Sequence, residues 1–142
     1  MSDQPKLKQS INPKLGAYRK AEVMTANREA ILLLLYEGAI RFLKQAITAV
    51  EKKDYSEKAR LVGRTQEIIN ELRATLNFDA GGEIASTLES LYEFITDRLL
   101  KGNQENNAQH LKEALNIIST LHIAWEQAIS SLKKNKESNQ QP

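Results

Sequence analysis

Apolar residues recur at three- and four-residue spacing in four stretches of the chain, which is the spacing that places side chains on one face of an α-helix. The first stretch begins near Thr25 or Asn27, either of which can cap a helix, and runs to about Lys53. The second opens directly after Asp54, which has the capping-box spacing to Glu57. The pattern therefore predicts helices rather than strands.

Two further helices are predicted in the second half of the chain. The second helix is expected to end at the stretch NFDAGG, where Gly81 and Gly82 permit the chain to reverse. The third is expected to stop at Gly102 and Asn103, and the fourth to start near Glu105. Four helices joined by short connections predict an all-α fold, an antiparallel four-helix bundle.

The two ends of the chain differ from the periodic region. Residues 1–24 are polar, carry two of the three prolines and are predicted to form a mobile N-terminal arm. Residues 25–134 form the predicted bundle. Residues 135–142 are polar and are predicted to be a disordered tail.

The first predicted helix has more apolar residues than the interior of a bundle needs. About three apolar positions per heptad suffice for a bundle helix, yet this helix has two apolar rows. The rows are Ile31, Leu35, Gly38, Phe42, Ala46 and Ala49, and Leu32, Tyr36, Ala39, Leu43, Ile47 and Val50. The fourth helix has a second row of its own, namely Ala114, Ile117, Leu121, Ala124 and Ala128. The surplus predicts either a groove for a partner or a helix that is the most buried member of the bundle, and periodicity alone leaves both open.

Composition narrows the classes of function. The net charge of +2 is too small to indicate nucleic-acid binding by itself, although residues 1–22 are basic. The chain has no cysteine and no apolar stretch typical of a signal peptide, so we expect a cytoplasmic protein. The apolar run from Ala30 to Leu35 is far shorter than the roughly 20 residues that span a bilayer, which argues against membrane insertion.

Chemistry-bearing motifs are sparse. A di-iron bundle needs Glu three residues before each ligating His, but Asn107 and Ser119 precede His110 and His122 at that spacing. His122 lies on an apolar stripe beside Trp125, so we interpret it as a core or groove residue. No glycine-rich phosphate loop and no context for a catalytic serine occur, so neither an enzyme nor a cofactor site is predicted.

Several segments together resemble one family. The stretches LLYEGAIRFLKQAI, KARLVGRTQEIINELRATLNFDAGGEIASTLESLYEFITDRLLKGN and a later AW, in this order and spacing, resemble the flagellar secretion chaperone FliS over about residues 17–130. The resemblance implies an antiparallel helical bundle in the cytoplasm that binds the disordered C-terminal segment of flagellin and prevents its premature polymerisation. It also implies an N-terminal segment that covers the bundle while flagellin is absent, for which Tyr18 and Val23 are the candidates.

The residue pattern and the resemblance together give a candidate set of partner-binding residues. These are Ile31, Leu35, Tyr36, Phe42, Leu43, Tyr92 and Trp125. The flagellar export machinery is a further candidate partner, and the chain is expected to be a monomer or weak dimer without catalytic activity. The alternative is a structural helical protein that forms homo-oligomers through the surplus apolar surface of the first and fourth helices. A nucleic-acid adaptor that uses the basic arm is a third interpretation.

Overall fold

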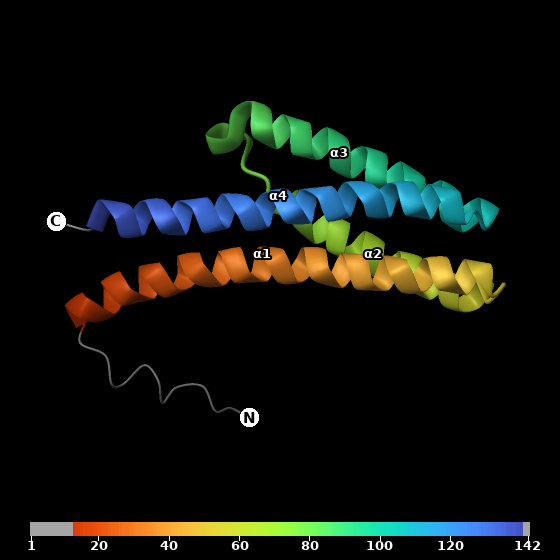
Figure 1. Ribbon diagram of the computed structural model, residues 1–142, viewed down its shortest axis with the longest axis horizontal. Helices are drawn as coiled ribbons and strands as arrows, with labels where there is room; N and C mark the ends of the chain where they lie inside the picture. Colours follow the sequence, from red (N-terminus) through yellow and green to blue (C-terminus); the bar gives the residue numbers. More distant parts are fainter. Residues whose placement is uncertain (1–12, 141–142) are drawn as a thin grey trace, which may run out of the picture. The chain divides into compact units, whose positions relative to one another are not determined.

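The computed structural model describes the backbone of residues 13–140 and the side chains of residues 28–138. It contains the helices α1 (Pro13–Glu51), α2 (Tyr55–Ala74), α3 (Phe78–Glu105) and α4 (Ala108–Gln140). The chain divides into two units, Met1–Ile31 and Leu32–Pro142, so α1 contributes residues to both. Figure 1 shows the order of the helices along the chain.

In the second unit, α2 and α3 run antiparallel, and so do α1 and α4. Arg73, at the end of α2, contacts Glu89 in the first half of α3. Lys58, at the start of α2, contacts the backbone oxygen of Asn103 near the end of α3. On α1 and α4, Glu51 is 3.6 Å from Lys112 and Tyr36 is hydrogen-bonded to Trp125. The predicted all-α fold is confirmed, and these contacts have the order of an antiparallel four-helix bundle.

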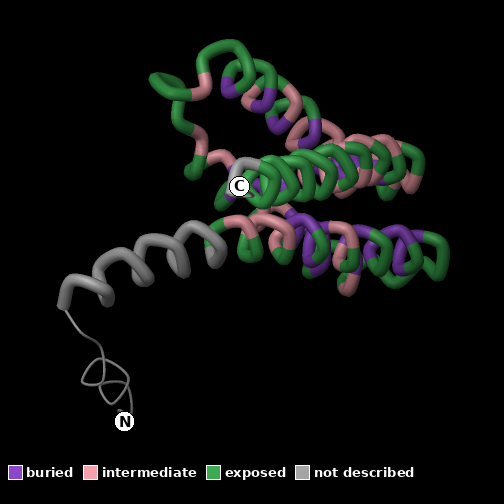
Figure 2. The backbone as a smooth tube through the Cα atoms, turned by 60° about the vertical axis from the view of Figure 1, so that its left-hand side comes forward, coloured by how far each residue is buried: buried purple, intermediate pink, exposed green. Residues whose placement is uncertain are grey.

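The core of the second unit is made by all four helices, and every buried position of α3 faces the same side of that helix (Figure 2). α1 contributes its last third to this core: both of its apolar rows are buried from Tyr36 to Val50, apart from the half-buried Phe42. α1 also approaches α2 closely at Gly38, where an added Cβ would lie 3.3 Å from Ile68 Cδ1. The surplus apolar residues of α1 are therefore mostly core residues between Tyr36 and Val50, whereas Ile31 and Leu34 are exposed.

The helix boundaries test the capping predictions. The side chain of Asp54 accepts a hydrogen bond from the backbone N–H of Glu57, which confirms the predicted start of the second helix. The predicted reversal at Gly81 and Gly82 is wrong: the chain reverses at residues 75–77, and Asn77 caps α3 by accepting from the N–H of Ala80. Because Asn77 caps α3 only three residues after α2 ends, the chain turns at residues 75–77 and not at the glycines.

α1 begins earlier and α4 ends later than predicted from the sequence. α1 starts at Pro13 rather than near Thr25, because a proline is tolerated at the first helical position and no later proline interrupts the helix. α4 continues to Gln140, so residues 135–140 are helical rather than part of a disordered tail. The same composition of Lys, Glu and Gln that looked like a polar tail is also compatible with a helix.

The turn between α3 and α4 is fastened to α2. Lys58 is almost fully buried, and its Nζ donates to the backbone oxygen of Asn103 at 2.8 Å and to Asn106 Oδ1 at 2.7 Å. Asn106 has a left-handed backbone (φ 50°) and ends α3. Burial lowers the pKa of Lys58. Two oxygen acceptors thus replace water around this ammonium group and hold the end of the bundle together.

Candidate functional site

Three aromatic side chains from different helices form a hydrogen-bonded cluster inside the bundle. The hydroxyl groups of Tyr36 on α1 and Tyr92 on α3 are bonded to each other, and Trp125 Nε1 on α4 donates to Tyr36 Oη at 3.2 Å. Tyr36 is fully buried and Tyr92 is 2% exposed. Because the indole N–H can only donate, the Tyr36 oxygen must accept from it. The cluster fixes the mutual positions of three helices and leaves both tyrosines out of reach of a partner in this structure.

The buried tyrosines predict a dependence of stability on alkaline pH. Burial raises the pKa of Tyr36 and, more strongly, the pKa of Tyr92, which also faces the Tyr36 hydroxyl. A tyrosine in the unfolded chain ionises near pH 10, so above that pH unfolding releases protons that the folded state retains. We expect the free energy of unfolding to fall by up to about 1.4 kcal/mol per pH unit for each tyrosine.

Urea unfolding between about pH 9 and 11 measures this effect. The control is the double variant Tyr36→Phe, Tyr92→Phe, which lacks both ionisable groups. The variant is expected to be less stable at neutral pH but to lose stability less steeply above pH 10. Equal slopes for the two proteins would contradict the assignment.

The structure sorts the predicted partner-binding residues into three groups. Tyr36, Leu43 and Tyr92 belong to the core. Leu35, Phe42 and Trp125 pack against the core but are only half-buried. Ile31 is exposed and belongs to the first unit, and the side chains of Tyr18 and Val23 lie outside the described residues. Of the predicted residues in the second unit, only the half-buried group offers surface to a partner.

A second region of apolar surface lies where α3 meets α4. Arg98 on α3 marks this border, because its Nη1 lies 3.2 Å from His110 Nδ1 and 3.6 Å from Glu113 Oε1 on α4. Its guanidinium also lies over the ring of Phe94, with 5.1 Å between Cζ and the ring centroid. From this charged cluster, both helices run on toward the opposite end of the bundle.

Beyond Arg98, the row on each helix that continues the α3–α4 border is mainly apolar. At steps of three and four residues from Arg98, the α3 row contains Phe94, Leu91, the exposed Thr87 and Ile84, and the α4 row contains Ile117, Leu121, Ala124 and Ala128. We call the seven apolar residues of these rows the α3–α4 seam. Ile84, Phe94, Ala124 and Ala128 are exposed, and the other three are half-buried. The seam extends over about 21 Å from Ile84 to Arg98, the length of about four helical turns.

Sequence reasoning found only half of the seam. The row on α4 was recognised as a surplus on the fourth helix, but no surplus row was recognised on the third. The signal was present in the spacing, since Ile84, Leu91 and Phe94 lie seven and three residues apart. What the sequence lacked was the knowledge of which α3 face meets α4.

A depression also lies between α1 and α4. It has a volume of about 480 Å³, and its lining includes Arg41, Lys44, His122 and Ile123. His122 Nε2 is buried without a hydrogen bond, 3.5 Å from Glu37 Oε2, and its ring stacks on Tyr36 with 6.4 Å between centroids. His122 is thus a groove-lining residue on the border of the core. Within residues 28–138 no three His, Asp or Glu side chains are grouped so that they could bind a metal ion.

No helix among the described residues is both long and apolar enough to cross a membrane. Fold and surface together define an all-α protein of the four-helix-bundle class, with a buried aromatic cluster and a partly exposed apolar seam. Sequence comparison identifies the family. The profile of the family described as flagellar protein FliS matches residues 11–132, and the chain belongs to this family.

Individual relatives agree with the profile. The flagellar secretion chaperone FliS of Bacillus subtilis is 32% identical over 120 residues, which cover 84% of this chain and 89% of that protein. The flagellar secretion chaperone FliSB of Pseudomonas aeruginosa is 34% identical over 107 residues, covering 75% and 85% of the two chains. The flagellar secretion chaperone FliS of Salmonella typhimurium is 34% identical over 109 residues, covering 76% and 81%.

Proposed function

We propose that this protein is a cytoplasmic export chaperone that binds the disordered C-terminal segment of flagellin and prevents premature polymerisation before secretion. The relatives are named flagellar secretion chaperones, and this name supports a role in binding an export substrate. The observation that carries the proposal is the α3–α4 seam, because it is an apolar surface of helical length without a covering element among residues 28–138. An amphipathic helix is the kind of ligand such a surface accommodates.

The seam has the shape features that helix binding requires. Ala124 and Ala128 are small and exposed, so the backbone of a bound helix can approach α4 closely. Ile84 and Phe94 on α3 are large and 69% and 43% exposed, so they can contact the flank of that helix. Leu35, Phe42 and Trp125 supply further half-buried apolar surface for other parts of a long client segment. Ile31, in the first unit, remains a candidate contact of its own.

The energetics suit a reversible complex. A disordered client loses conformational freedom when it folds on binding, at a cost of about 2 to 5 kcal/mol. The apolar area that the client buries must exceed this cost, and a shallow seam exceeds it by less than a deep pocket would. An export chaperone requires this balance, because the client must be released at the export machinery.

Self-association is the competing function. It was predicted to use the surplus apolar residues of the first and fourth helices, but nearly all of those of α1 from Tyr36 to Val50 are in the core. The remaining exposed apolar surface therefore lies mainly on α3 and α4. The molecular mass on dilution distinguishes the two functions, since a chaperone is expected to be a monomer or weak dimer without client.

The test is a calorimetric titration of the full chain with a peptide of about 40 residues from the C-terminus of flagellin of the same organism. We expect one-to-one binding with a negative heat-capacity change, because apolar surface is buried. The single tryptophan, Trp125, provides a second signal through its fluorescence. No heat at several temperatures together with unchanged fluorescence would contradict the proposed function and favour the homo-oligomer.

A further inference from the structure

α3 is not one regular helix, because its backbone breaks at Gly82. This residue has φ 51° and ψ −121°, a backbone conformation that residues with a Cβ rarely adopt. The break separates the first turn, residues 78–81, from the remainder of the helix. A Cβ added at Gly82 would meet no atom within 4 Å, so the glycine is required by the backbone conformation and not by a lack of space.

The first turn is held as a unit on its own. Asn77 accepts a hydrogen bond at its side chain from the N–H of Ala80, at 3.1 Å, and at its backbone oxygen from the N–H of Gly81, at 2.7 Å. Directly before it, the Thr75 hydroxyl donates to the backbone oxygen of Leu72 at the end of α2. The turn between α2 and α3 is thus defined locally, and Gly82 sets the direction of the first turn relative to the rest of α3.

The break changes the position of Phe78. In an uninterrupted helix Phe78 would share a face with Ala85 and Tyr92, which lie seven and fourteen residues later and are both buried. Instead, Phe78 is 51% exposed. The kink therefore moves a large aromatic side chain off the inner face of α3 and presents it to solvent.

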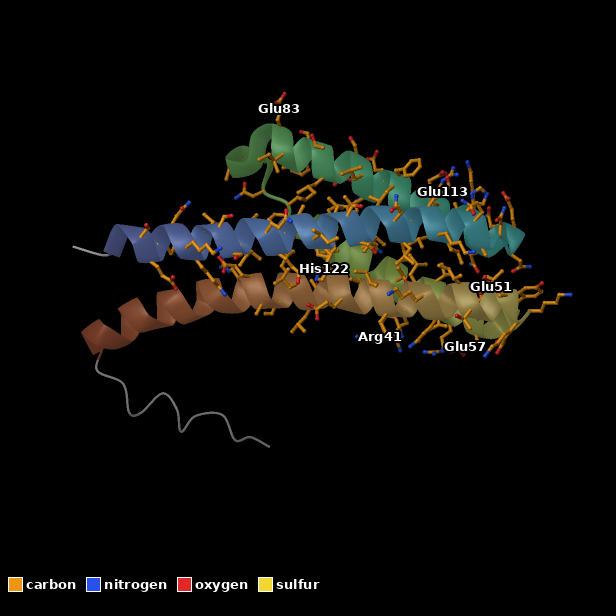
Figure 3. The ribbon with its side chains drawn as sticks, in the orientation of Figure 1. Arg41, Glu51, Glu57, Glu83, Glu113 and His122 are labelled. Carbon is orange, nitrogen blue, oxygen red and sulfur yellow. The ribbon has the colours of Figure 1, made fainter. Side chains whose placement is uncertain are left out.

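The surroundings of Phe78 indicate what it contacts. Ile84, just after the kink, is 69% exposed and is the first residue of the α3–α4 seam, so a large exposed apolar side chain stands on each side of the kink. Asp79 follows Phe78 in the sequence and Glu83 precedes Ile84; both are exposed, and among the described side chains neither forms an ion pair. Figure 3 shows Glu83 pointing away from α4. Apolar surface between unpaired carboxylates fits an apolar segment that also carries a Lys or Arg.

We propose that Phe78, presented by the kink at Gly82, is a client-contact residue that together with Ile84 binds an apolar, Lys- or Arg-bearing part of the client next to the seam. This inference rests on the proposed function. Phe78 adds aromatic area to the exposed end of the seam, and Asp79 and Glu83 select the charge of the client segment. Gly82 acts as a positioning residue, because it makes no contact of its own with the client.

The test uses the full chain and the same flagellin C-terminal peptide. Phe78→Ala removes the contact, and Gly82→Ala disfavours the kink without a steric clash. The matched control is Gly63→Ala, because Gly63 lies inside α2 and a Cβ there also meets nothing within 4 Å. We expect Phe78→Ala and Gly82→Ala each to weaken binding about tenfold, and Gly63→Ala to leave it unchanged.

The double variant Phe78→Ala, Gly82→Ala separates presentation from a general loss of structure. If Gly82 acts only by positioning Phe78, the double variant binds no more weakly than Phe78→Ala alone. Additive losses would overturn the positioning role. Binding of Phe78→Ala at the affinity of the unmodified chain would overturn the contact while the proposed function stands. If the unmodified chain does not bind the peptide, the proposed function and this contact both fall.

The proposed preference of Asp79 and Glu83 for a client segment with Lys or Arg is tested by repeating the titration at several salt concentrations. Asp79→Asn with Glu83→Gln is expected to reduce the sensitivity of binding to salt, because exposed charge pairs are screened by ions. The fold of every variant is monitored by circular dichroism and thermal unfolding. An unchanged salt dependence would contradict the part of the proposal that concerns Lys or Arg.

Discussion

Ala124→Asp is expected to weaken binding of the flagellin peptide by at least about 100-fold while the protein stays folded. Ala124 is exposed in the centre of the α4 row of the seam, so a carboxylate there is solvated in the free protein. In the complex the same carboxylate would be buried against apolar client side chains without a partner, which costs several kcal/mol. The loss of affinity therefore arises in the complex and not in the fold.

Ser130→Asp is the control for this prediction. Ser130 is exposed on the same helix, six residues after Ala124 and two after Ala128, and neither spacing is a helical step of three or four, so it lies outside the row that contains them. Both substitutions add one negative charge to α4. Calorimetric titration of the two variants is expected to show weak binding for Ala124→Asp and an unchanged affinity for Ser130→Asp. Equal effects of the two variants would contradict the placement of the client on the seam.

The exposed seam and the buried tyrosine cluster have complementary roles in this proposal. Tyr36, Tyr92 and Trp125 tie α1, α3 and α4 together through hydrogen bonds in the interior. The seam lies on two of these helices, so its two rows are carried by elements whose spacing the cluster fixes. A preformed surface lowers the cost of binding for the chaperone, and the ordering cost then falls mainly on the client.

The existence of the helices followed from the sequence, because their signal is local. Asp54 with Glu57 gave the start of α2 correctly, since a capping interaction depends on residues that are three positions apart. The start of α1 was wrong because Thr25 and Asn27 are good caps that need not be used when the helix can continue to Pro13. Capping residues permit a helix to begin but do not force it to.

The candidate site was harder to predict, because it depends on which faces meet. Two apolar rows on α1 were compatible with a groove or with a core helix, and only the packing of the other helices shows that nearly all of both rows between Tyr36 and Val50 belongs to the core. Tyr36 and Leu43 were therefore assigned to a surface that they do not reach. The role of Gly82 was also not predictable from the sequence. A pair of glycines is compatible both with a turn between two helices and with a kink within one helix.

Gly102→Ala is expected to lower the free energy of unfolding by about 2 kcal/mol, although alanine is the better helix former. Gly102 is buried near the end of α3, and a Cβ added there would lie 2.5 Å from Leu111 Cδ2 and 2.8 Å from Leu111 Cγ. Leu111 is fully buried on α4 and has little room to move away. The backbone oxygen of Gly102 also accepts from the N–H groups of Asn106 and Asn107, so displacement of α3 would weaken the helix end.

Urea unfolding followed by circular dichroism measures this loss, and two further variants make it specific. Gly63→Ala adds the same methyl group where it meets no atom, so it is expected to raise stability by about 0.5 to 1 kcal/mol. Leu111→Ala removes the side chain that an alanine at position 102 would strike, so the two substitutions together are expected to cost less than the sum of their separate effects. Strict additivity would mean that the close approach of α3 and α4 at Gly102 does not limit the choice of residue there. Coupling would identify this approach as the contact that sets the spacing of α3 and α4 at the charged end of the seam.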